Sequence, residues 1–371
     1  MKANDRYNPN SFNALHAGVA FLAFWAMNLG LSFLFAAFEK NGVRIEDEYA
    51  EMCLQLILMA AGLALIVWIM SLAARSNAIN GGGFLVRKGC GTEILMAFVL
   101  IFGLCSLLMP LAQSFAENCD FIRFRGNIPN VDPQAQVDAE DVSYYPLLLI
   151  VLMPVLPAIF EELLFRGVIL KGLLQFGKVP AVVLSALMFA LAHGSYEQFI
   201  YQFIVGIVVG FLFVETKNIF VSMAAHFANN FFASWVLGIN LLAAGEGANS
   251  AIYQAVVQVM FYLLGAVCIV AAFLYFGKRM LHMRSFPENA RGDVAASFVV
   301  NDMVSGTLVE RKAWYACGAL LQKNAEPKFF VNKKGGRNSL NRKSGFVPAA
   351  IVLGIGLAIA VGFLVLSLVV V

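Results

Sequence analysis

The sequence predicts an all-α, polytopic membrane helix bundle with about nine transmembrane helices and its N-terminus inside the cell. Three observations lead to this prediction. Of the 371 residues, 60% are hydrophobic and only 13% are charged, whereas soluble domains carry about 25% charged residues. The apolar residues gather in runs that approach the length of about 20 residues that a helix needs to cross a bilayer. The basic residues fall mainly on one side of these runs.

Each predicted span is one apolar run between polar segments. The runs cover residues 14–38, 52–74, 94–115, 145–169, 179–192, 199–214, 219–239, 252–276 and 346–371. The first run is too long for the core of a signal peptide and is therefore interpreted as a span. The fifth and sixth are short, so these helices are tilted, longer than these limits, or a re-entrant pair.

The distribution of lysine and arginine predicts the orientation, because cytoplasmic loops carry the excess of these residues. With the N-terminus inside, 22 of the 26 basic residues fall in cytoplasmic segments. The outside loops are acidic, and the C-terminus is then outside. This composition excludes a soluble enzyme and a nucleic-acid binder, and it makes the lipid bilayer the first expected partner.

The chain divides into five parts. Residues 1–144 hold the first three spans and the acidic outside loops, and residues 145–240 form the predicted catalytic core. An eighth span lies in 241–276, a basic cytoplasmic loop in 277–345, and a final span in 346–371. The basic loop is expected to be a solvated tether, although such a segment can also rest on anionic lipid.

The fourth run is unusual because it contains two adjacent carboxylates, Glu161 and Glu162. A charged residue near the centre of a span costs about 2.5–3.5 kcal/mol on insertion scales. Glu162 and Arg166 are four residues apart, which favours an ion pair on one helix face. Glu161 points about 100° away from Glu162, so it is predicted to remain available for chemistry.

Two of the four histidines also lie in apolar surroundings. His193 ends the fifth run, and His226 is followed four residues later by Asn230, so both side chains of this second pair can face one cavity. Glu161 and His193 lie sixteen residues on either side of Gly177. An antiparallel hairpin that turns near Gly177 would therefore bring them to similar depth.

These polar groups are predicted to form a functional site rather than the polar contacts that also hold membrane helices together. A carboxylate beside a histidine can activate water, and an amide beside an imidazole can stabilise an oxyanion. Glu161, His193 and His226 could instead bind zinc. The sequence lacks the H-E-x-x-H pattern of common zinc proteases, and a site without metal or other cofactor is the favoured interpretation.

The motifs E-E-x-x-x-R (Glu161, Glu162, Arg166), F-x-x-x-H (Phe189, His193) and H-x-x-x-N (His226, Asn230) occur in this order on hydrophobic segments. This order resembles the CPBP family of CAAX proteases and bacteriocin-processing enzymes, also called the Abi family, which includes the Ras-converting CAAX endopeptidase. The resemblance covers about residues 146–239.

The resemblance implies a multi-pass intramembrane endopeptidase whose site opens to the cytosol, here expected in a bacterial plasma membrane. It implies that Glu161 activates water with help from His193, and that His226 and Asn230 stabilise the oxyanion. Glu162 and Arg166 would be structural partners. The substrate would be a membrane-associated peptide or protein, lipidated in the CAAX type. The alternative is a secondary transporter or a non-catalytic immunity or scaffold protein, since transporters also keep ionisable residues inside the membrane.

Overall fold

The computed structural model describes residues 12–43, 45, 47–74, 90–118, 145–194, 196–216, 218–243, 249–284 and 342–369. In these residues the chain is helical apart from short turns and contains no strand. The predicted all-α class is therefore confirmed for this part of the protein. The acidic segment 119–144 and most of the predicted basic loop, residues 285–341, lie outside the described residues.

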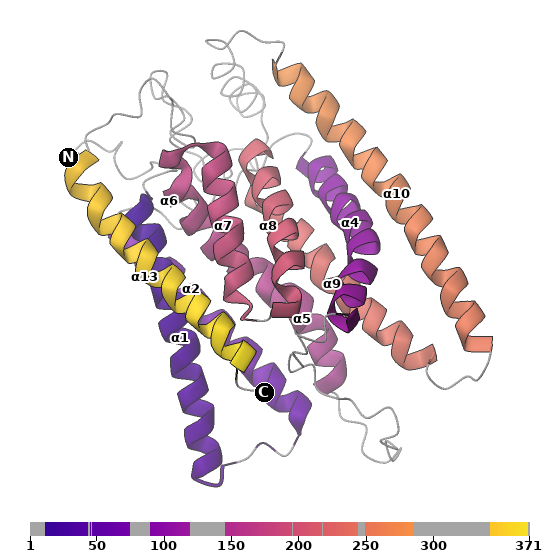
Figure 1. Ribbon diagram of the computed structural model, residues 1–371, viewed down its shortest axis with the longest axis horizontal. Coiled ribbons are helices and arrows are strands. Elements are labelled where there is room, and N and C mark those ends of the chain that lie inside the picture. Colours follow the sequence, from indigo (N-terminus) through magenta and orange to yellow (C-terminus); the bar gives the residue numbers. More distant parts are fainter. Residues whose placement is uncertain are drawn as a thin grey trace, which may run out of the picture.

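The helices form one bundle, with a central group flanked on two sides (Figure 1). The central group is α5 (Tyr145–Leu164), α7 (Lys178–Ala192), α8 (Tyr196–Thr216) and α9 (Ile219–Ala243). On one side lie α1 (Ala14–Lys40), α2 (Glu48–Ala73) and α13 (Arg342–Val369). On the other lie α4 (Cys90–Asn118) and α10 (Asn249–Arg284).

The described helices only partly test the predicted spans. Five are long and apolar enough to cross a membrane: Ala14–Lys40, Tyr49–Ala73, Cys90–Leu108, Gln198–Thr216 and Val259–Lys278. They correspond to the predicted first, second, third, sixth and eighth spans, and the sixth is longer than its apolar run. The apolar helices Lys178–Ala192 and Ala349–Phe363 are shorter. The total of nine spans and the orientation stay predictions.

The two ends of the last predicted loop differ from the expected limits. Helix α10 continues to Arg284, eight residues beyond the predicted end of the eighth span, and α13 begins at Arg342 rather than at residue 346. Both extensions are polar. A helix satisfies its own backbone hydrogen bonds, so it can continue past the end of an apolar run.

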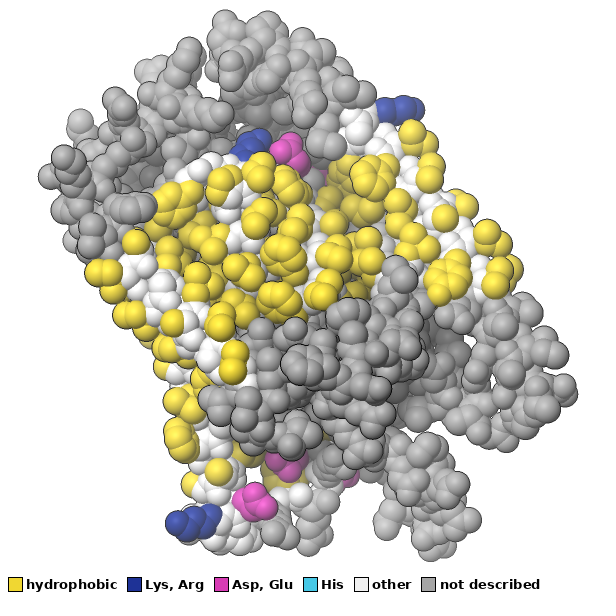
Figure 2. All heavy atoms as spheres, viewed as in Figure 1, with side chains coloured by type: hydrophobic (Ala, Val, Ile, Leu, Met, Phe, Trp, Pro, Cys, Tyr) yellow, Lys and Arg dark blue, Asp and Glu magenta, His cyan; other side chains and the backbone are white. Residues whose placement is uncertain are grey.

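Apolar side chains cover the outside of the bundle as well as its interior. Leu263 and Val267 on α10 and Ile351 on α13 are exposed. Figure 2 shows hydrophobic side chains over the described part of one face, with the visible charged side chains near its two ends. This surface is what a bilayer requires, because lipid tails solvate apolar groups and charged groups are costly there.

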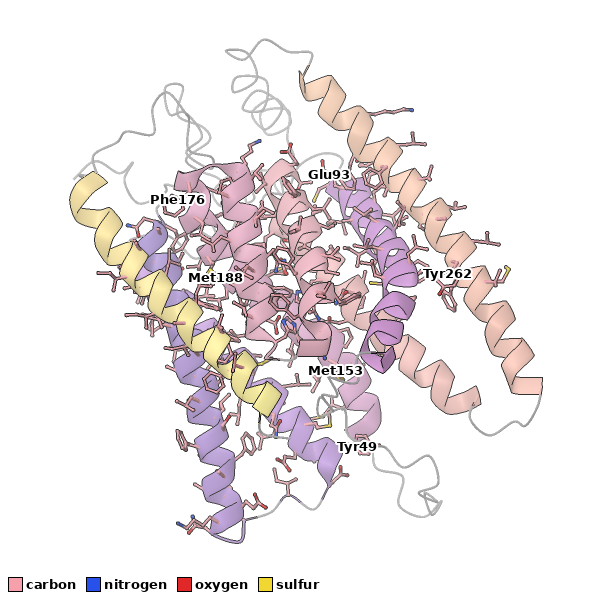
Figure 3. All side chains as sticks on the ribbon, in the orientation of Figure 1. Tyr49, Glu93, Met153, Phe176, Met188 and Tyr262 are labelled. Carbon is pink, nitrogen blue, oxygen red and sulfur yellow. The ribbon has the colours of Figure 1, made fainter. Side chains whose placement is uncertain are left out.

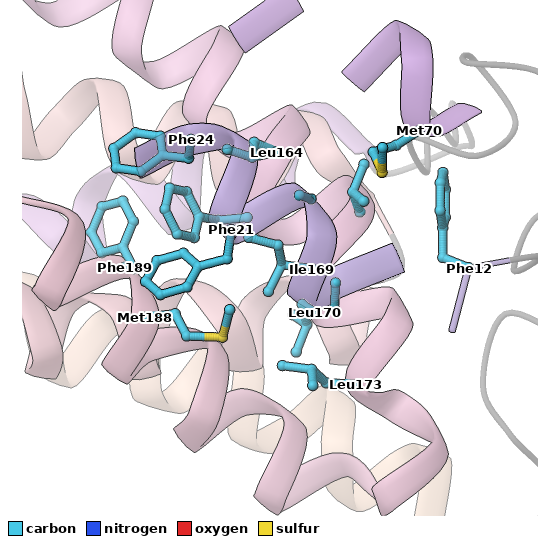
Figure 4. Close-up of a cluster of buried hydrophobic side chains, with 14 of the residues drawn as sticks. Phe12, Phe21, Phe24, Met70, Leu164, Ile169, Leu170, Leu173, Met188 and Phe189 are labelled. Carbon is cyan, nitrogen blue, oxygen red and sulfur yellow. The ribbon is translucent and has the colours of Figure 1, made fainter. Parts of the chain in front are cut away.

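Two buried clusters fill the interior. The larger joins α1, α2, the end of α5, α7 and α13, and Figure 4 shows Phe21 and Phe24 of α1 beside Phe189 of α7. The smaller joins α4, α8, α9 and α10. Helix α5 packs on both α2 and α9, so its last turns lie between the two clusters.

Candidate active site

The carboxylate pair lies at the end of α5, just before a change in helix type. After Leu164 the chain forms a π-helix, η3 (Phe165–Leu170), in which all six residues are buried. A π-turn carries an extra residue per turn and often occurs at functional sites. The π-segment holds Arg166 one turn beyond Glu162.

Glu162 is fully buried, and its carboxylate contacts both Arg166 and His226. Its Oε1 lies 2.7 Å from Nη1 of Arg166, which confirms the ion pair predicted from the spacing. The same oxygen accepts a hydrogen bond from Nδ1 of His226 at 2.8 Å. Arg166 also donates from Nη2 to the carbonyl of Gly206 on α8 at 3.3 Å. Glu162 thus connects α5 to α9 as well as to Arg166.

Glu161 faces the other ring nitrogen of His226. The distance between Oε2 of Glu161 and Nε2 of His226 is 3.9 Å, and the Glu161 side chain is 13% exposed, against 0% for Glu162. The two carboxylates therefore occupy different environments. Glu161 is the one that a substrate or water can reach.

His193 is the first residue after α7. Gly194 follows with φ of +60° and donates its N–H to the carbonyl of Leu191 at 3.0 Å, which is a left-handed helix end typical of glycine. Nδ1 of His193 lies 2.9 Å from the carbonyl of Phe189. A carbonyl can only accept, so Nδ1 carries the hydrogen and Nε2 of the neutral ring is an acceptor.

The hairpin predicted to turn near Gly177 is present. The chain passes through α6 (Lys171–Leu173) and the 3₁₀ turn η4 (Leu174–Phe176), and Gly177 then adopts φ of +106°. The hydroxyl of Ser185 on α7 donates to the carbonyl of Phe165 at 3.3 Å. This bond joins residues ten before and ten after position 175, as an antiparallel hairpin requires.

Phe189 is the common apolar contact of the site. Its ring centroid is 4.7 Å from that of His193 and 5.5 Å from that of His226. The guanidinium carbon of Arg166 lies 4.5 Å from the same ring. His193 also interacts electrostatically with Glu161 and His226. The Phe189 ring therefore contacts His193, His226 and Arg166, and the two glutamates join this group through their contacts with Arg166 and His226.

Asn230 lies on the same helix as His226, and its side chain forms hydrogen bonds with Met153 and Asn229. Its Nδ2 donates to the carbonyl of Met153 on α5 at 3.5 Å, and its Oδ1 accepts from Nδ2 of Asn229 at 3.0 Å. In a helix the Met153 carbonyl would accept from residue 157, but Pro157 has no N–H. In Figure 3, Met153 lies lower along the bundle than Phe176 and higher than Tyr49.

Sequence reasoning missed three polar groups next to Asn230, two of which, Cys105 and Asn229, are buried. Asn229 accepts at Oδ1 from the hydroxyl of Tyr201 at 2.6 Å, and that hydroxyl lies 3.0 Å from Sγ of Cys105. A second amide beside Asn230 inside an apolar run is a signal that could have been used, because such residues are costly in membranes. Nothing in the sequence pattern distinguishes Cys105 from a small hydrophobic residue.

The fit of a zinc ion to these side chains is poor. Among the described residues, no group of three His, Cys, Asp or Glu side chains is arranged to hold a metal ion. The alternative set of Glu161, His193 and His226 is therefore not gathered as ligands. Nδ1 of His226 is bound to Glu162, so only Nε2 of this ring remains for another partner.

Residues 143–232 match the family described as type II CAAX prenyl endopeptidase Rce1-like. The matched segment begins just before α5, ends in α9, and contains all six predicted site residues. The resemblance seen in the three motifs is thus confirmed over this segment, which is similar to a family of CAAX prenyl endopeptidases. The five long apolar helices agree with a multi-pass membrane protein. Neither the curated proteins nor the solved structures gave a match to this chain.

Proposed function

We propose that this protein is an intramembrane endopeptidase that hydrolyses a peptide bond with a water molecule activated by Glu161. The observation that carries the proposal is the difference between the two carboxylates. Glu162 is buried and neutralised by Arg166, whereas Glu161 is 13% exposed and faces Nε2 of His226. A general base has to contact the water molecule from which it takes a proton, so its side chain must be accessible to water.

The tautomer of His193 supports a role beside Glu161. With the hydrogen on Nδ1 held by the Phe189 carbonyl, Nε2 accepts a hydrogen bond from water. A water molecule has two hydrogens, so Glu161 and His193 can each accept one. The oxygen lone pair is then directed toward a scissile carbonyl.

The proposed reaction is a balanced hydrolysis. Glu161 takes a proton from water as the oxygen bonds to the carbonyl carbon, and the carbonyl oxygen becomes an oxyanion. The proposed donors to this oxyanion are Asn230 and His226. In this step His226 is the imidazolium ion, which donates from Nδ1 to Glu162 and from Nε2 to the oxyanion. The carbon–nitrogen bond then breaks, and Glu161 returns the proton to the leaving amine.

The proposed substrate is a membrane-associated peptide or protein. A site at the junction of apolar helices suits a substrate that is itself held in the bilayer, and the family match favours a prenylated C-terminus. Peptide pheromones, bacteriocin leaders and fragments of membrane proteins can also be held at the bilayer, so they are further candidate substrates.

The test compares the purified full chain with two glutamate variants. Glu161→Gln removes the base without changing the side-chain volume, and Glu215→Gln alters an exposed glutamate paired with Lys178. The probes are a peptide that ends in a farnesylated Cys-aliphatic-aliphatic-X sequence and the same peptide without the prenyl group. Release of the C-terminal tripeptide is measured by mass spectrometry.

We expect cleavage by the wild type and by Glu215→Gln and a loss of about 10²-fold or more in Glu161→Gln, which should keep the wild-type melting temperature. Cleavage by Glu161→Gln at the wild-type rate would refute the proposal. If neither probe is cleaved, membrane peptides from cells with the wild type and with Glu161→Gln are compared. An identical peptide set would then count against a peptidase.

A further inference from the structure

A buried hydrogen-bonded cluster joins three helices behind Asn230. It consists of Cys105 on α4, Tyr201 on α8 and Asn229 on α9. Cys105 is fully buried and Asn229 is 3% exposed. A polar group in such a position is costly unless its hydrogen bonds are satisfied, and the bonds within this cluster meet that requirement.

The bonds of this cluster fix the orientation of the Asn229 amide. Its oxygen accepts from the Tyr201 hydroxyl at 2.6 Å and from the Cys105 thiol at 3.5 Å. Its nitrogen donates to Oδ1 of Asn230 at 3.0 Å. A flipped Asn229 would place its N–H₂ against the thiol and its oxygen against the Asn230 oxygen, which leaves two acceptors facing each other.

The orientation of Asn230 is fixed from its other side, because the Met153 carbonyl can only accept a hydrogen bond and therefore faces the Nδ2 end of the amide. Because Oδ1 of Asn230 receives the Asn229 hydrogen bond, its Nδ2 end is turned away from Asn229 and toward α5. One N–H is directed at the Met153 carbonyl, at the long distance of 3.5 Å. The proposed function uses this amide nitrogen as an oxyanion donor.

We propose that Tyr201 and Asn229 are positioning residues that hold Asn230 with its N–H end toward α5, the helix that carries Glu161. The Cys105 thiol, 3.0 Å from the Tyr201 oxygen, packs against that hydroxyl. This inference rests on the proposed function. Tyr201 and Asn229 act through Asn230 and contact neither Glu161 nor the substrate in this scheme. The gain is preorganisation, since a donor that is already aligned needs no rearrangement during the reaction.

The distinguishing experiment is a kinetic double-mutant cycle. Tyr201→Phe removes only the hydroxyl, and Asn230→Ala removes the donor that the hydroxyl is proposed to orient. We expect Tyr201→Phe to lower kcat about tenfold while KM changes less than about twofold. Asn230→Ala should lower kcat about 10²-fold.

The double variant decides between positioning and an independent structural role. If Tyr201 acts through Asn230, the double variant should be no slower than Asn230→Ala alone. Independent effects would multiply to about 10³-fold and would overturn the inference. Tyr275→Phe, on α10 and outside the cluster, is the matched control and should retain wild-type kinetics.

One replacement variant and one parallel measurement keep the result interpretable. If Tyr201→Phe does not fold, Asn229→Leu takes its place, because leucine has a similar volume without the amide. Glu161→Gln is measured in parallel. Glu161-dependent cleavage combined with multiplying effects would refute only the positioning role, whereas cleavage that does not depend on Glu161 would refute the proposed function itself.

Discussion

Glu162 and His226, 64 residues apart in the sequence, share a buried hydrogen bond of 2.8 Å between Oε1 and Nδ1. The same oxygen is bound to Arg166. The bond holds the His226 ring so that Nε2 faces Glu161. Glu162 is therefore a partner of His226, a proposed oxyanion donor, as well as of Arg166, and its role as a structural partner stays a prediction.

The first prediction concerns this buried carboxylate. Glu162→Ala leaves the Arg166 charge buried without its partner, which should lower the free energy of unfolding by about 3–5 kcal/mol. The measurement is reversible unfolding of the purified protein in mixed micelles. Glu215→Ala is the control, and because its ion pair with Lys178 is exposed and screened by water, stability should change by less than about 1 kcal/mol.

A double substitution separates stability from chemistry at the same position. Glu162→Leu with Arg166→Met replaces the ion pair by apolar groups, which is often neutral for folding. This variant should fold and yet cleave poorly, because His226 has lost the acceptor that orients it. A folded double variant with wild-type kcat would show that Glu162 contributes nothing beyond its pairing with Arg166.

The second prediction tests the helix end that places His193. Gly194 has φ of +60°, and a Cβ atom added there would meet no other atom within 4 Å. Gly194→Ala therefore isolates backbone strain, which costs about 1–2 kcal/mol for a left-handed residue with a Cβ atom. Gly194→Asn should cost less, because asparagine tolerates this conformation better.

The cleavage rates of these variants should follow the same order as their stabilities, so Gly194→Ala should be slower than Gly194→Asn. The reason is that a shift at the end of α7 also moves His193. Thermal melting and kcat are measured on both proteins. Equal stability of Gly194→Ala and the wild type would contradict the described helix end.

The third prediction concerns metal. A site that uses Glu161 and His193 on water should keep its activity after strong chelation and dialysis. Elemental analysis of the purified protein should then find far less than one zinc per chain. Stoichiometric zinc, together with activity that is lost on chelation and restored by zinc, would instead favour Glu161, His193 and His226 as ligands.

The fourth prediction concerns orientation. Basic residues favour the cytoplasmic side, so a reporter fused after Asn240 should report the outside and one fused after Lys328 the inside. Alkaline phosphatase, active only outside, and a fluorescent protein that folds only inside form a complementary pair. The reverse pattern would invert the predicted topology.

Local spacing was sufficient to predict several features of this protein. The apolar runs predicted helices, the four-residue spacing predicted the Glu162–Arg166 pair, and Gly177 marked the hairpin that brings α7 back along η3. These features depend on neighbours within a few turns, and helix geometry alone relates such residues in space. The three motifs also pointed to the family match at residues 143–232.

The tertiary structure alone decided which polar groups meet across helices. Periodicity places His226 and Asn230 on one face of α9, but it does not state that His226 binds Glu162 or that Asn230 reaches the carbonyl left free by Pro157. The cluster of Cys105, Tyr201 and Asn229 draws on three helices separated by up to 124 residues. Such contacts depend on how whole helices pack, because packing of side chains over their full length sets the rotation and depth of each helix.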